Sequence, residues 1–515
     1  MKLTIEQVIT HADSRLLVPP PDTHAVLRAL TWDSRRVIPG SLFVGIVGEQ
    51  ANGNSYIVEA IEAGAALVIA SEDPSPAALD AAASHGVALL QARDNDVMSA
   101  LQKLARAWRS ELGSTVVGIT GSSGKTTTKD LIAGVVSARF NTHATLGNRN
   151  SELGLAETIL NATELHELIV CEMGMQAQGE IAMLCQAAQP HIGVVTNVGV
   201  AHCELLGSRE NIARAKAELL ESLPDTTGIA ILPGDDPYTP SLRAFAQLDE
   251  RGLSIISYGL GEQNDIRATH IEYDDLGHPS FDIWTPDGSC YPVRLQLQGE
   301  HNVLNALAAV AVGLRVGVPI ASIIEAVATV KPAALRQEML RTAQGELILN
   351  DTYNANPDSM RAALSLLKRL ATSGKRVAVL GDMYELGPEE ARYHRQIGEY
   401  AFVNGVDELV TVGSLGAEIA AGALAVGMPA ERVHRCSDVA EALEALSTLR
   451  QPGEVSQEPE QDVPLRQTQD SPSPHESSSP EDSWAYSSVI LVKASRGMQL
   501  ERIARGLVAE AENPA

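Results

Sequence analysis

A strand, a glycine turn and the start of a helix follow one another near residue 120, and this order constrains the fold more than any other stretch. The β-branched run from Thr115 to Ile119 predicts a buried strand. The small residues at 120–124, Thr-Gly-Ser-Ser-Gly, then form a turn, and Lys125-Thr126 opens an apolar pattern with helical spacing. Backbone N–H groups at such a turn and the N-terminus of the following helix attract anions, so the stretch predicts a cradle for phosphate.

The residue types in this turn suit a nucleotide and its metal ion. Lys125 neutralises phosphate charge, and the Thr126 hydroxyl can hold Mg²⁺. One departure is that the strict phosphate-loop motif has glycine five places before Gly124, where this chain has Ile119. The alternative interpretation is a glycine turn that carries Lys-Thr by chance. The phosphate contacts are assigned to Gly121, Ser122, Ser123, Gly124, Lys125, Thr126 and Thr127.

Composition limits the classes of protein that the chain can belong to. Its 515 residues carry a net charge of −26, and 44% of them are hydrophobic. That length suggests about three domains, each with an ordinary apolar core. The acidic charge argues against nonspecific nucleic-acid binding, because a polyanion would be repelled, whereas a nucleotide needs only a local positive site.

The cysteines and apolar runs indicate the compartment. The five cysteines are scattered and lack metal-binding spacing, which favours reduced thiols in a cytoplasmic protein. No basic segment followed by an apolar core begins the chain, and no apolar run approaches the length of about 18 residues that a membrane helix needs. We therefore expect neither secretion nor a membrane span.

Short apolar strands alternate with helical patterns along most of the chain, which predicts an α/β protein. We expect domains at 1–112, 113–332 and 333–515, the central one built on a parallel sheet. Residues 265–297 change to short segments with turn signals, which indicates an antiparallel side element. The third domain has a Rossmann-like alternation but lacks GxGxxG after its first strand. Residues 451–483 are rich in Pro, Ser, Gln and Glu, which predicts a disordered insertion.

Polar residues follow two apolar strands of the central domain, where ligands sit in parallel sheets. Glu172 comes directly after one strand and is an oxygen ligand of the kind that Mg²⁺ prefers. Its alternative role is a carboxylate that stabilises a helix start. Asn197 and His202 follow the next strand. A lone histidine is usually structural, but the position of His202 after this strand favours a functional role.

Other polar clusters carry weaker signals when taken alone. Lys216 lies in a segment with helical periodicity, and this context alone predicts a surface lysine. Asn302 and Asn305 are three residues apart on one helical face, where they can cap the helix or contact a purine edge. The segment Asp33-Ser-Arg-Arg36 lies between strands and either binds an anion or forms a solvated loop.

The third domain adds Arg336 and a polar segment at 350–357, Asn-Asp-Thr-Tyr-Asn-Ala-Asn-Pro. An Asn/Pro turn that caps the next helix explains Asn356 and Pro357. It leaves Arg336 and Asp351 without a role, so we expect these two to meet a substrate.

Taken together, the motifs resemble the Mur ligase family. Those that carry the resemblance are Gly118–Thr126, Gly147–Asn150, Glu172–Met175, Asn197–His202, Lys216, His301–Asn305, Asn350–Pro357 and Leu380–Gly387. They lie in family order and cover nearly the whole chain except 451–483. The phosphate loop is shared by all Mur ligases and by folylpolyglutamate synthase. The stretches 172–175, 353–357 and 381–387 point to the family member that adds D-alanyl-D-alanine.

The resemblance implies a three-domain architecture and a reaction. The N-terminal domain would bind the UDP-muramoyl end, the central domain ATP, and the C-terminal domain the amino substrate. ATP would phosphorylate the terminal carboxylate of UDP-N-acetylmuramoyl-tripeptide, and the amine of D-alanyl-D-alanine would attack the acyl phosphate. Phosphoryl transfer of this kind mainly requires positioning and neutralisation of anionic oxygens. The expected cofactors are ATP and Mg²⁺, and the expected state is a monomer in the cytoplasm.

The resemblance also assigns roles to single residues. Lys125 would lie on the β- and γ-phosphates, with Thr126 and Glu172 on one Mg²⁺ and His202 on a second. Lys216 matches a position that is carbamylated in several relatives, and it would bind metal if so modified. The catalytic set is Lys125, His202, Lys216 and Arg336, and the further ATP contacts are Asn197, Asn305, Arg336 and Asp351. The substrate set is Asp33, Ser34, Arg35, Asn148, Asn150, Ser151, Tyr353, Asn354, Asn356, Asp382 and Glu385.

Departures and alternatives accompany this assignment. This chain has Asn52-Gly-Asn54 where relatives usually have Asp-Gly-His, and Ser151 where they have asparagine. One alternative is another amide ligase of the family, either the third-residue-adding enzyme or folylpolyglutamate synthase. Another is a nucleotide-dependent switch, which would hydrolyse ATP slowly whether or not D-alanyl-D-alanine is present.

Overall fold

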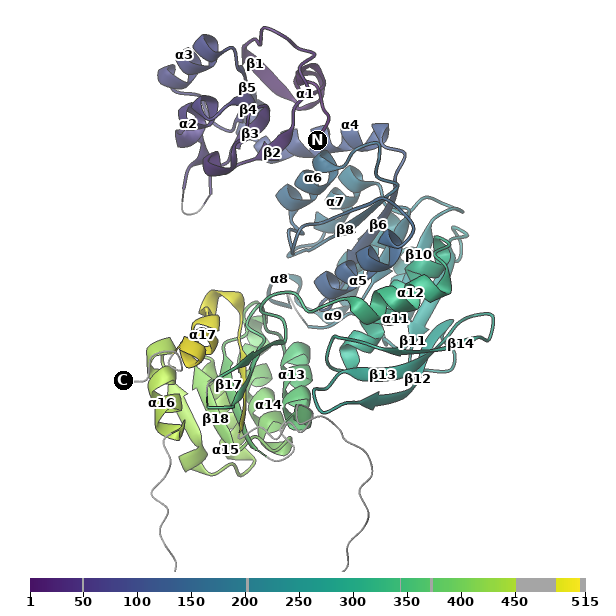
Figure 1. The fold of residues 1–515 in the computed structure, drawn as a ribbon, viewed down its shortest axis with the longest axis vertical. Coiled ribbons are helices and arrows are strands. Elements are labelled where there is room, and N and C mark those ends of the chain that lie inside the picture. The colour runs from purple at the N-terminus through teal and green to yellow at the C-terminus, as the bar shows by residue number, and fades with distance from the viewer. Residues whose placement is uncertain (49–50, 201–202, 343, 371–373, 451–487, 510–515) are drawn as a thin grey trace, which may run out of the picture. The chain divides into compact units, whose positions relative to one another are not determined.

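The computed structural model describes residues 1–48, 51–200, 203–342, 344–370, 374–450 and 488–509. The chain divides into two compact units, unit 1 (Met1–Tyr273 and His278–Ala333) and unit 2 (Asp274–Gly277 and Ala334–Ala515). Both units are built from sheets covered by helices (Figure 1). The predicted α/β class is therefore confirmed.

A small sheet begins unit 1. Its elements are α1 (Ile5–His11), β1 (Ser14–Val18), β2 (Ala29–Thr31), β3 (Ser41–Gly45), α2 (Ile57–Glu62), β4 (Ala65–Ala70), α3 (Pro76–His85), β5 (Ala88–Ala92) and α4 (Val97–Glu111). The strand order is β1-β5-β4-β3-β2, with β1 antiparallel to β5 and the other pairs parallel. Alternation along β3 divides the core, since Leu42 and Val44 join the cluster of α1 and α4 while Phe43 joins that of α2 and α3.

A larger sheet forms the rest of unit 1. Its elements are β6 (Thr115–Thr120), α5 (Lys125–Ser137), β7 (Thr142–Ala144), α6 (Glu152–Asn161), β8 (Leu168–Glu172), α7 (Glu180–Ala188), β9 (Ile192–Val195), α8 (Cys203–Leu206), α9 (Arg209–Glu221), β10 (Ile229–Pro233), α10 (Thr239–Phe245), β11 (Ser254–Gly259), β12 (Ile266–Tyr273), β13 (Pro279–Trp284), β14 (Cys290–Arg294), α11 (Glu300–Arg315) and α12 (Ile320–Thr329). The strand order is β14-β13-β12-β11-β10-β9-β6-β8-β7. Strands β6 to β12 pair in parallel, while β12, β13 and β14 pair antiparallel. The antiparallel side element is thus confirmed.

Helices cover both faces of the larger sheet because its central strands are apolar on both sides. On β6, Val116 packs with α4, α6, α7 and α9, whereas Val117 packs with α5, α11 and α12. Leu101 and Leu104 of α4 belong to the same cluster as Val116 and as Leu42 of the small sheet. The two sheets of unit 1 therefore share one apolar core through α4.

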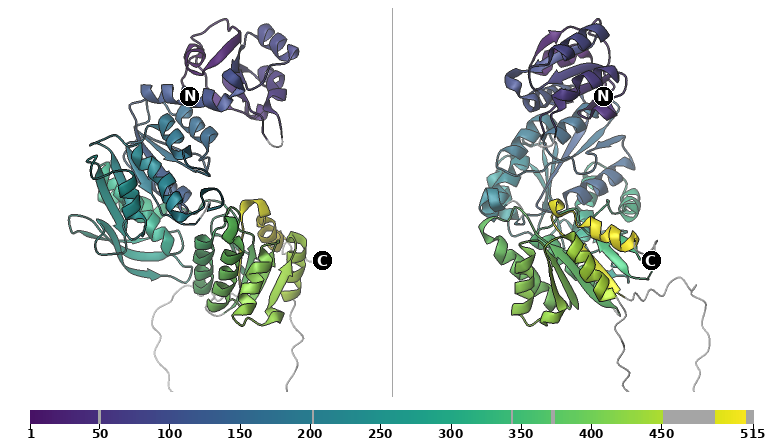
Figure 2. Two further views of the ribbon diagram at one scale, coloured as in Figure 1. Left: turned by 180° about the vertical axis from the view of Figure 1, so that it is seen from behind. Right: turned by 90° about the vertical axis from the view of Figure 1, so that its left-hand side faces the viewer.

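Unit 2 contains a third sheet. Its elements are β15 (Glu338–Arg341), β16 (Leu347–Asn350), α13 (Pro357–Leu370), β17 (Lys375–Gly381), α14 (Glu390–Val403), β18 (Glu408–Val412), α15 (Gly416–Ala425), β19 (Val433–Cys436), α16 (Val439–Arg450), β20 (Ser488–Lys493) and α17 (Glu501–Ala509). The strand order is β15-β16-β20-β17-β18-β19, with β15 antiparallel and the rest parallel. Helices α13, α14 and α15 cover one face, and α16 and α17 lie side by side on the other (Figures 1 and 2).

Three further expectations concern parts of this fold. All five cysteines lie in the described part of the chain and are free thiols. No helix among the described residues is long and apolar enough to cross a membrane. The predicted insertion at 451–483 lies outside the described residues.

Candidate active site

The turn after β6 requires its glycines. Gly121 and Gly124 have φ angles of +154° and +79°, which L-residues rarely adopt. A Cβ atom on Gly121 would overlap Thr196 Oγ1, and one on Gly124 would lie 2.6 Å from Asn305 Oδ1. Helix α5 begins at Lys125 directly after this turn, as the sequence predicts. The strand, turn and helix thus follow one another as the sequence predicts, and the binding of phosphate at this turn stays a prediction.

Asn197, at the end of β9, holds the turn in place. Its carbonyl oxygen accepts from Ser122 N, and its Oδ1 accepts from Ser123 N, both at 3.1 Å. Its Nδ2 donates to Ser123 Oγ over 3.0 Å. Two of the N–H groups that the sequence predicts at the phosphates thus donate to Asn197 in this structure. The role seen here for Asn197 is to organise the loop.

Two lysines lie close to this loop. Lys125 Nζ donates to the carbonyl oxygen of Gly121 at 2.8 Å. Lys216, on α9, is only 1% exposed, and burial followed by the charge of Lys125 holds its pKa well below the ordinary lysine range. Lys216 is therefore not the surface lysine that its sequence context suggests when taken alone.

Glu172, at the end of β8, is the carboxylate closest to the loop hydroxyl. The residue is 1% exposed, and its Oε1 accepts from Thr126 Oγ1 at 3.2 Å and from Asn150 Nδ2 at 2.8 Å. Its Oε2 is buried and has no hydrogen-bond partner among the described residues. Burying a carboxylate oxygen unpaired is unfavourable, and a cation would satisfy it. Thr126 and Glu172 supply oxygen donors, the type that Mg²⁺ prefers, so the residues present fit this ion.

The loop after β7 orients Glu172 from the other side. Thr145 Oγ1 accepts from Glu172 N at 3.1 Å, and Asn150 adds the amide contact described above. Lys129, which is 2% exposed, donates to the carbonyl oxygens of Thr145 and Gly147 at 2.9 and 2.7 Å. Asn148 and Ser151 of this loop are exposed. Sequence reasoning missed Lys129, although it lies one helical turn after Lys125.

The two asparagines of α11 form a buried chain that ends at the loop. Asn305 Oδ1 accepts from Thr128 Oγ1 at 3.1 Å, and its Nδ2 donates to Asn302 Oδ1 at 2.9 Å. Asn302 in turn donates to the carbonyl oxygen of Gln298 at 2.8 Å. Here Asn305 therefore joins α5 to α11, and its predicted contact with adenine stays a prediction.

In the small sheet, the predicted substrate residues bind one another. Arg35 donates from Nε and Nη2 to the two carboxylate oxygens of Asp33 at 2.8 and 2.9 Å, and these bonds lower the pKa of Asp33. Ser34 donates to Glu59 Oε1 at 3.1 Å. The Asn52 and Asn54 side chains form a local network in which Asn54 Nδ2 donates to Asn52 Oδ1 at 2.9 Å.

In unit 2, the predicted nucleotide residues lie on adjoining segments. The guanidinium carbon of Arg336 lies 4.0 Å from the centre of the Tyr353 ring. Asp351 Oδ1 accepts from Gln337 N at 3.3 Å, and its Oδ2 lies 2.6 Å from Lys493 Nζ. The structure therefore brings Arg336, Asp351 and Tyr353 together. Lys493 was missed, although it ends an apolar strand just as Glu172 does.

The remaining predicted residues of unit 2 have mostly local contacts. Asn356 Oδ1 accepts from Ser359 N at 2.8 Å, which caps α13, and Asn354 Oδ1 accepts from Ala355 N at 2.9 Å. Asp382 is 5% exposed and accepts from Gly416 N at 2.8 Å, at the start of α15. Glu385 adopts a positive φ of 64°.

His394 is a buried residue that supports the loop containing Asp382 and Glu385. Its Nε2 accepts from Met383 N at 2.8 Å, and its Nδ1 lies 2.7 Å from the carbonyl oxygen of Glu390. Nδ1 must carry the proton, because Nε2 accepts. Burial lowers the pKa of His394, in agreement with a neutral ring. His394 is not among the residues predicted from the sequence.

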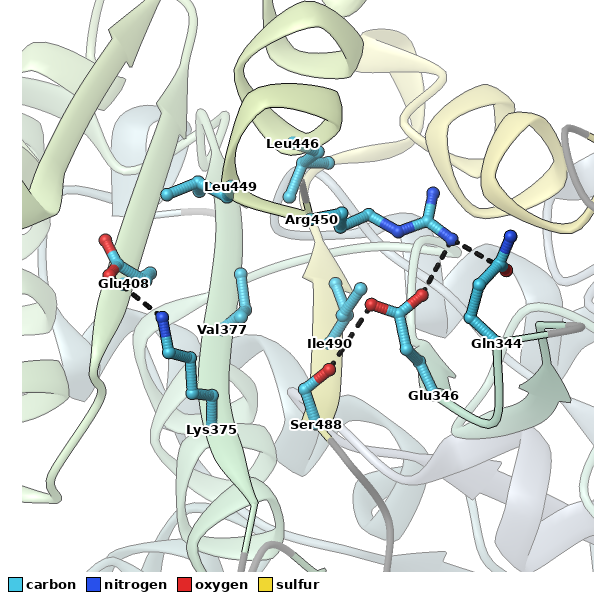
Figure 3. Close-up of a pocket in the computed structure, with 10 residues that line it drawn as sticks. All are labelled: Gln344, Glu346, Lys375, Val377, Glu408, Leu446, Leu449, Arg450, Ser488 and Ile490. Atoms are coloured by element: carbon cyan, nitrogen blue, oxygen red, sulfur yellow. Dashed lines mark hydrogen bonds and ion pairs between the residues drawn. The ribbon is translucent and has the colours of Figure 1, made fainter. Parts of the chain in front are cut away.

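A pocket in unit 2 lies away from these loops (Figure 3). It has a volume of about 250 Å³ and is lined by residues at the amino ends of the strands and by Leu446, Leu449 and Arg450 of α16. On one side of it, Glu346 pairs with Arg450 at 2.7 Å and accepts from Ser488 Oγ at 3.3 Å. The pocket thus lies at the amino ends of the strands, whereas Asp351 follows the carboxyl end of β16.

His202 lies outside the described residues, so its predicted metal contact stays a prediction. Among the described residues, no three His, Cys, Asp or Glu side chains gather as a metal-binding group.

Family models match three segments of the chain. The Mur ligase family catalytic domain matches residues 27–109, the Mur ligase middle domain matches 119–313, and the Mur ligase glutamate ligase domain matches 335–456. A relative from Bacillus subtilis, UDP-N-acetylmuramoyl-tripeptide--D-alanyl-D-alanine ligase, is 34% identical over 96% of this chain and 95% of its own.

The chain belongs to the Mur ligase family. Solved structures agree with this membership. MurF from Acinetobacter baumannii has a TM-score of 0.81 and 29% identity to this Mur ligase, with 99% of each chain covered. The MurF ligase from Thermotoga maritima, solved in complex with ADP, has a TM-score of 0.72 and 28% identity over 95% of this chain and 99% of that one. The three-domain Mur ligase architecture expected from the sequence is thus confirmed.

Proposed function

We propose that this Mur ligase joins D-alanyl-D-alanine to UDP-N-acetylmuramoyl-tripeptide in an ATP-dependent reaction of peptidoglycan precursor synthesis. The observation that carries the proposal is the 34% identity, over 96% of the chain, to the UDP-N-acetylmuramoyl-tripeptide--D-alanyl-D-alanine ligase of Bacillus subtilis. The phosphate loop beside Lys216 and Glu172 supplies chemistry that suits such a reaction.

The reaction needs an activated acid. A carboxylate is a poor electrophile, so the γ-phosphoryl group of ATP first passes to an oxygen of the tripeptide's terminal carboxylate. The dipeptide nitrogen then attacks the carbonyl carbon, the carbon–oxygen bond to phosphate breaks, and the nitrogen loses a proton. The products are the amide, ADP and inorganic phosphate. Because both steps involve crowded negative charge, positioning and neutralisation provide most of the catalysis.

The roles of unit 1 residues follow from this chemistry. Lys125 neutralises the β- and γ-phosphates, and Asn197 keeps the loop in shape for them. Mg²⁺ bound by Thr126 and Glu172 would offset the charge of the phosphate oxygens. Lys216, whose depressed pKa favours the unprotonated amine that reacts with CO₂, would add oxygen ligands if carbamylated. His202 is proposed for a second Mg²⁺.

The remaining assignments divide among the three proposed domains. Residues 1–112 would bind the UDP-muramoyl end through Asp33, Ser34 and Arg35, and 113–332 would bind ATP, with Asn305 at the adenine. Residues 333–515 would supply Arg336 and Asp351 to the nucleotide. The proposed contacts of the tripeptide and the dipeptide are Asn148, Asn150, Ser151, Tyr353, Asn354, Asn356, Asp382 and Glu385. We further propose a monomer that works in the cytoplasm.

The decisive experiment is product analysis. Purified protein is incubated with Mg²⁺, ATP, D-alanyl-D-alanine and a tripeptide precursor that ends in either meso-diaminopimelate or lysine. Mass spectrometry should show a pentapeptide product from at least one precursor. Amide formation only in parallel incubations in which a single amino acid such as glutamate replaces D-alanyl-D-alanine would assign the chain to another ligase of the family. ATP hydrolysis that the dipeptide does not change would indicate a nucleotide switch.

The role of Lys125 gives a second test. Lys125→Ala should lower the rate of ligation by roughly a hundredfold or more, because a charge that stabilises the transferring phosphoryl group is removed. Circular dichroism should be unchanged. The matched control is Lys375→Ala, since this lysine is 64% exposed and begins β17, at the end of that strand opposite Asp382. Ligation by Lys125→Ala at the control rate would reject the role.

A further inference from the structure

Lys493 is a buried lysine for which the sequence analysis gives no role. It ends β20, the strand between β16 and β17 at the centre of the third sheet. Its side chain is 2% exposed. Lysine is seldom buried so completely unless its ammonium group is paired.

The ammonium group of Lys493 contacts three oxygens of one loop. It lies 2.6 Å from Asp351 Oδ2, 2.9 Å from the carbonyl oxygen of Asn354 and 3.4 Å from that of Asp351. All three donor positions of the ammonium are therefore directed at residues 351–354. A buried ion pair adds little net stability compared with apolar packing, because both charges lose their hydration. Its clearest effect is to fix the orientation of the Asp351 carboxylate.

Asp351 and its loop in turn hold the backbone of the segment that contains Arg336. Its second oxygen, Oδ1, accepts from Gln337 N at 3.3 Å, and Tyr353 N donates to the carbonyl oxygen of Leu335 at 3.1 Å. Leu335 and Gln337 have φ angles of +61° and +51°, which non-glycine residues hold only when their surroundings enforce them. Arg336 therefore stands between two strained residues, and hydrogen bonds from the loop of Asp351 keep both in place.

We propose that Lys493 is a positioning residue that fixes Asp351 and, through Asp351, the backbone on both sides of Arg336. The consequence for catalysis depends on the proposed function, in which Asp351 and Arg336 contact the nucleotide. Lys493 itself touches neither ATP nor the metal in this proposal. It sets the geometry of the two groups that unit 2 contributes.

The experiment compares Lys493→Met with Arg450→Met by hydrogen–deuterium exchange of the full chain without ligands. Arg450 is the matched control, because its pair with Glu346 is also largely buried in unit 2, with side chains 15% and 9% exposed, but lies at the opposite edge of the sheet. In Lys493→Met, the amides of Gln337 and Tyr353 should exchange about tenfold faster, the change expected when one ordinary hydrogen bond is lost. In Arg450→Met they should exchange at the wild-type rate. Should Lys493→Met fail to fold, Lys493→Gln is measured with the same expectation.

Wild-type exchange in the lysine variant, or an equal rise in Arg450→Met, would overturn the proposal. Kinetics then test the link to catalysis, since Lys493→Met should raise the KM for ATP about tenfold and leave the KM for the UDP-muramoyl substrate within about twofold. A variant that raises both values equally would show a merely structural lysine. The exchange result needs no turnover, so a wild-type protein that makes no product would reject the proposed function without deciding the role of Lys493.

Discussion

Glu172, Lys216 and Lys493 are charged side chains that the fold removes almost completely from water, each with no more than 2% exposure. Such burial is unfavourable unless a partner or a function accounts for it. Lys493 has its partner in Asp351, whereas Glu172 keeps one oxygen without a partner among the described residues. Perturbed groups of this kind concentrate at functional sites, which is why each of these three residues is a candidate for a functional role.

His394 makes the stability of unit 2 depend on pH. Burial lowers its folded-state pKa below the ordinary value of 6.5, although the carboxylates of Asp382, Glu390 and Glu418 oppose this shift. The unfolded chain therefore binds the proton more tightly. The contribution of neutral His394 to the free energy of unfolding is fully present above about pH 6.5. It is lost as the pH falls from there toward the folded-state pKa, by about 1 kcal/mol per pH unit.

His394→Gln should remove this dependence. Thermal unfolding of the wild type should therefore shift downward between pH 7.5 and 5.5 by more than that of the variant. The other histidines with pKa values lowered by burial, His143, His166 and His191, are present in both proteins and cancel in the comparison. Identical shifts in the two proteins would exclude a neutral His394 as the cause.

At the level of residues, the most direct rule is that polar side chains at the end of a parallel strand lie where ligands bind. Glu172 and Asn197 were selected by that rule, and the same rule applied to Lys493 would have found it. Asn305 was selected for its spacing, but its contact with Thr128 depends on how α11 packs on α5. Periodicity within one helix does not contain that information. The roles of these residues toward substrates stay predictions.

At the scale of elements, the turn between β6 and α5 depends on two neighbours that come from distant parts of the chain. Thr196 lies against Gly121, and Asn305 lies against Gly124. The loop is thus shaped by the end of β9 and by α11, as well as by its own glycines. These two neighbours fix the shape of the turn before any ligand binds.

Gly124→Ala should weaken nucleotide binding. The new Cβ would lie 2.6 Å from Asn305 Oδ1, and alanine at a φ of +79° is strained by roughly 1 kcal/mol or more. We expect the affinity for ADP with Mg²⁺, measured by titration calorimetry, to fall at least about tenfold.

Gly113→Ala is the control for this substitution. A Cβ at Gly113 meets nothing within 4 Å, and the residue is not among those with positive φ. Its affinity for ADP should equal that of the wild type. Equal affinities for all three proteins would show that the turn tolerates a side chain at Gly124.

The sequence predicted most elements because their apolar patterns are local. The strand at 115–119 and the helix from Lys125 lie where expected. Helices α1 and α3 and strand β1 were not predicted, since their short segments have weak periodicity. Nor does a local pattern reveal that β20, the last strand in the chain, occupies the centre of its sheet. That placement is a property of long-range pairing.

For the whole molecule, the segment between α16 and β20 can be tested by removal. Arg450 and Ser488, which flank it, both bind the carboxylate of Glu346, at 2.7 and 3.3 Å. The two ends are therefore close enough for a short connection, and β20 is held by its pairing with β16 and β17. Shortening a connection between fixed ends also lowers the entropy lost on folding.

Replacing residues 452–486 with a short Gly-Ser linker should leave the rate of ligation unchanged and leave the unfolding temperature equal to that of the wild type or slightly above it. Differential scanning calorimetry and the product assay measure the two quantities. A large loss of activity with an unchanged unfolding temperature would give the segment a catalytic role that the sequence analysis does not expect.

Arg450 and Ser488 lie close together because both bind Glu346, and this proximity has a practical use. The junction lies at the edge of the sheet opposite Asp351 and Arg336. A fluorescent reporter spliced in there would be anchored at both termini by a single carboxylate. Its signal would follow unit 2 while the loops proposed to contact the nucleotide keep their native sequence.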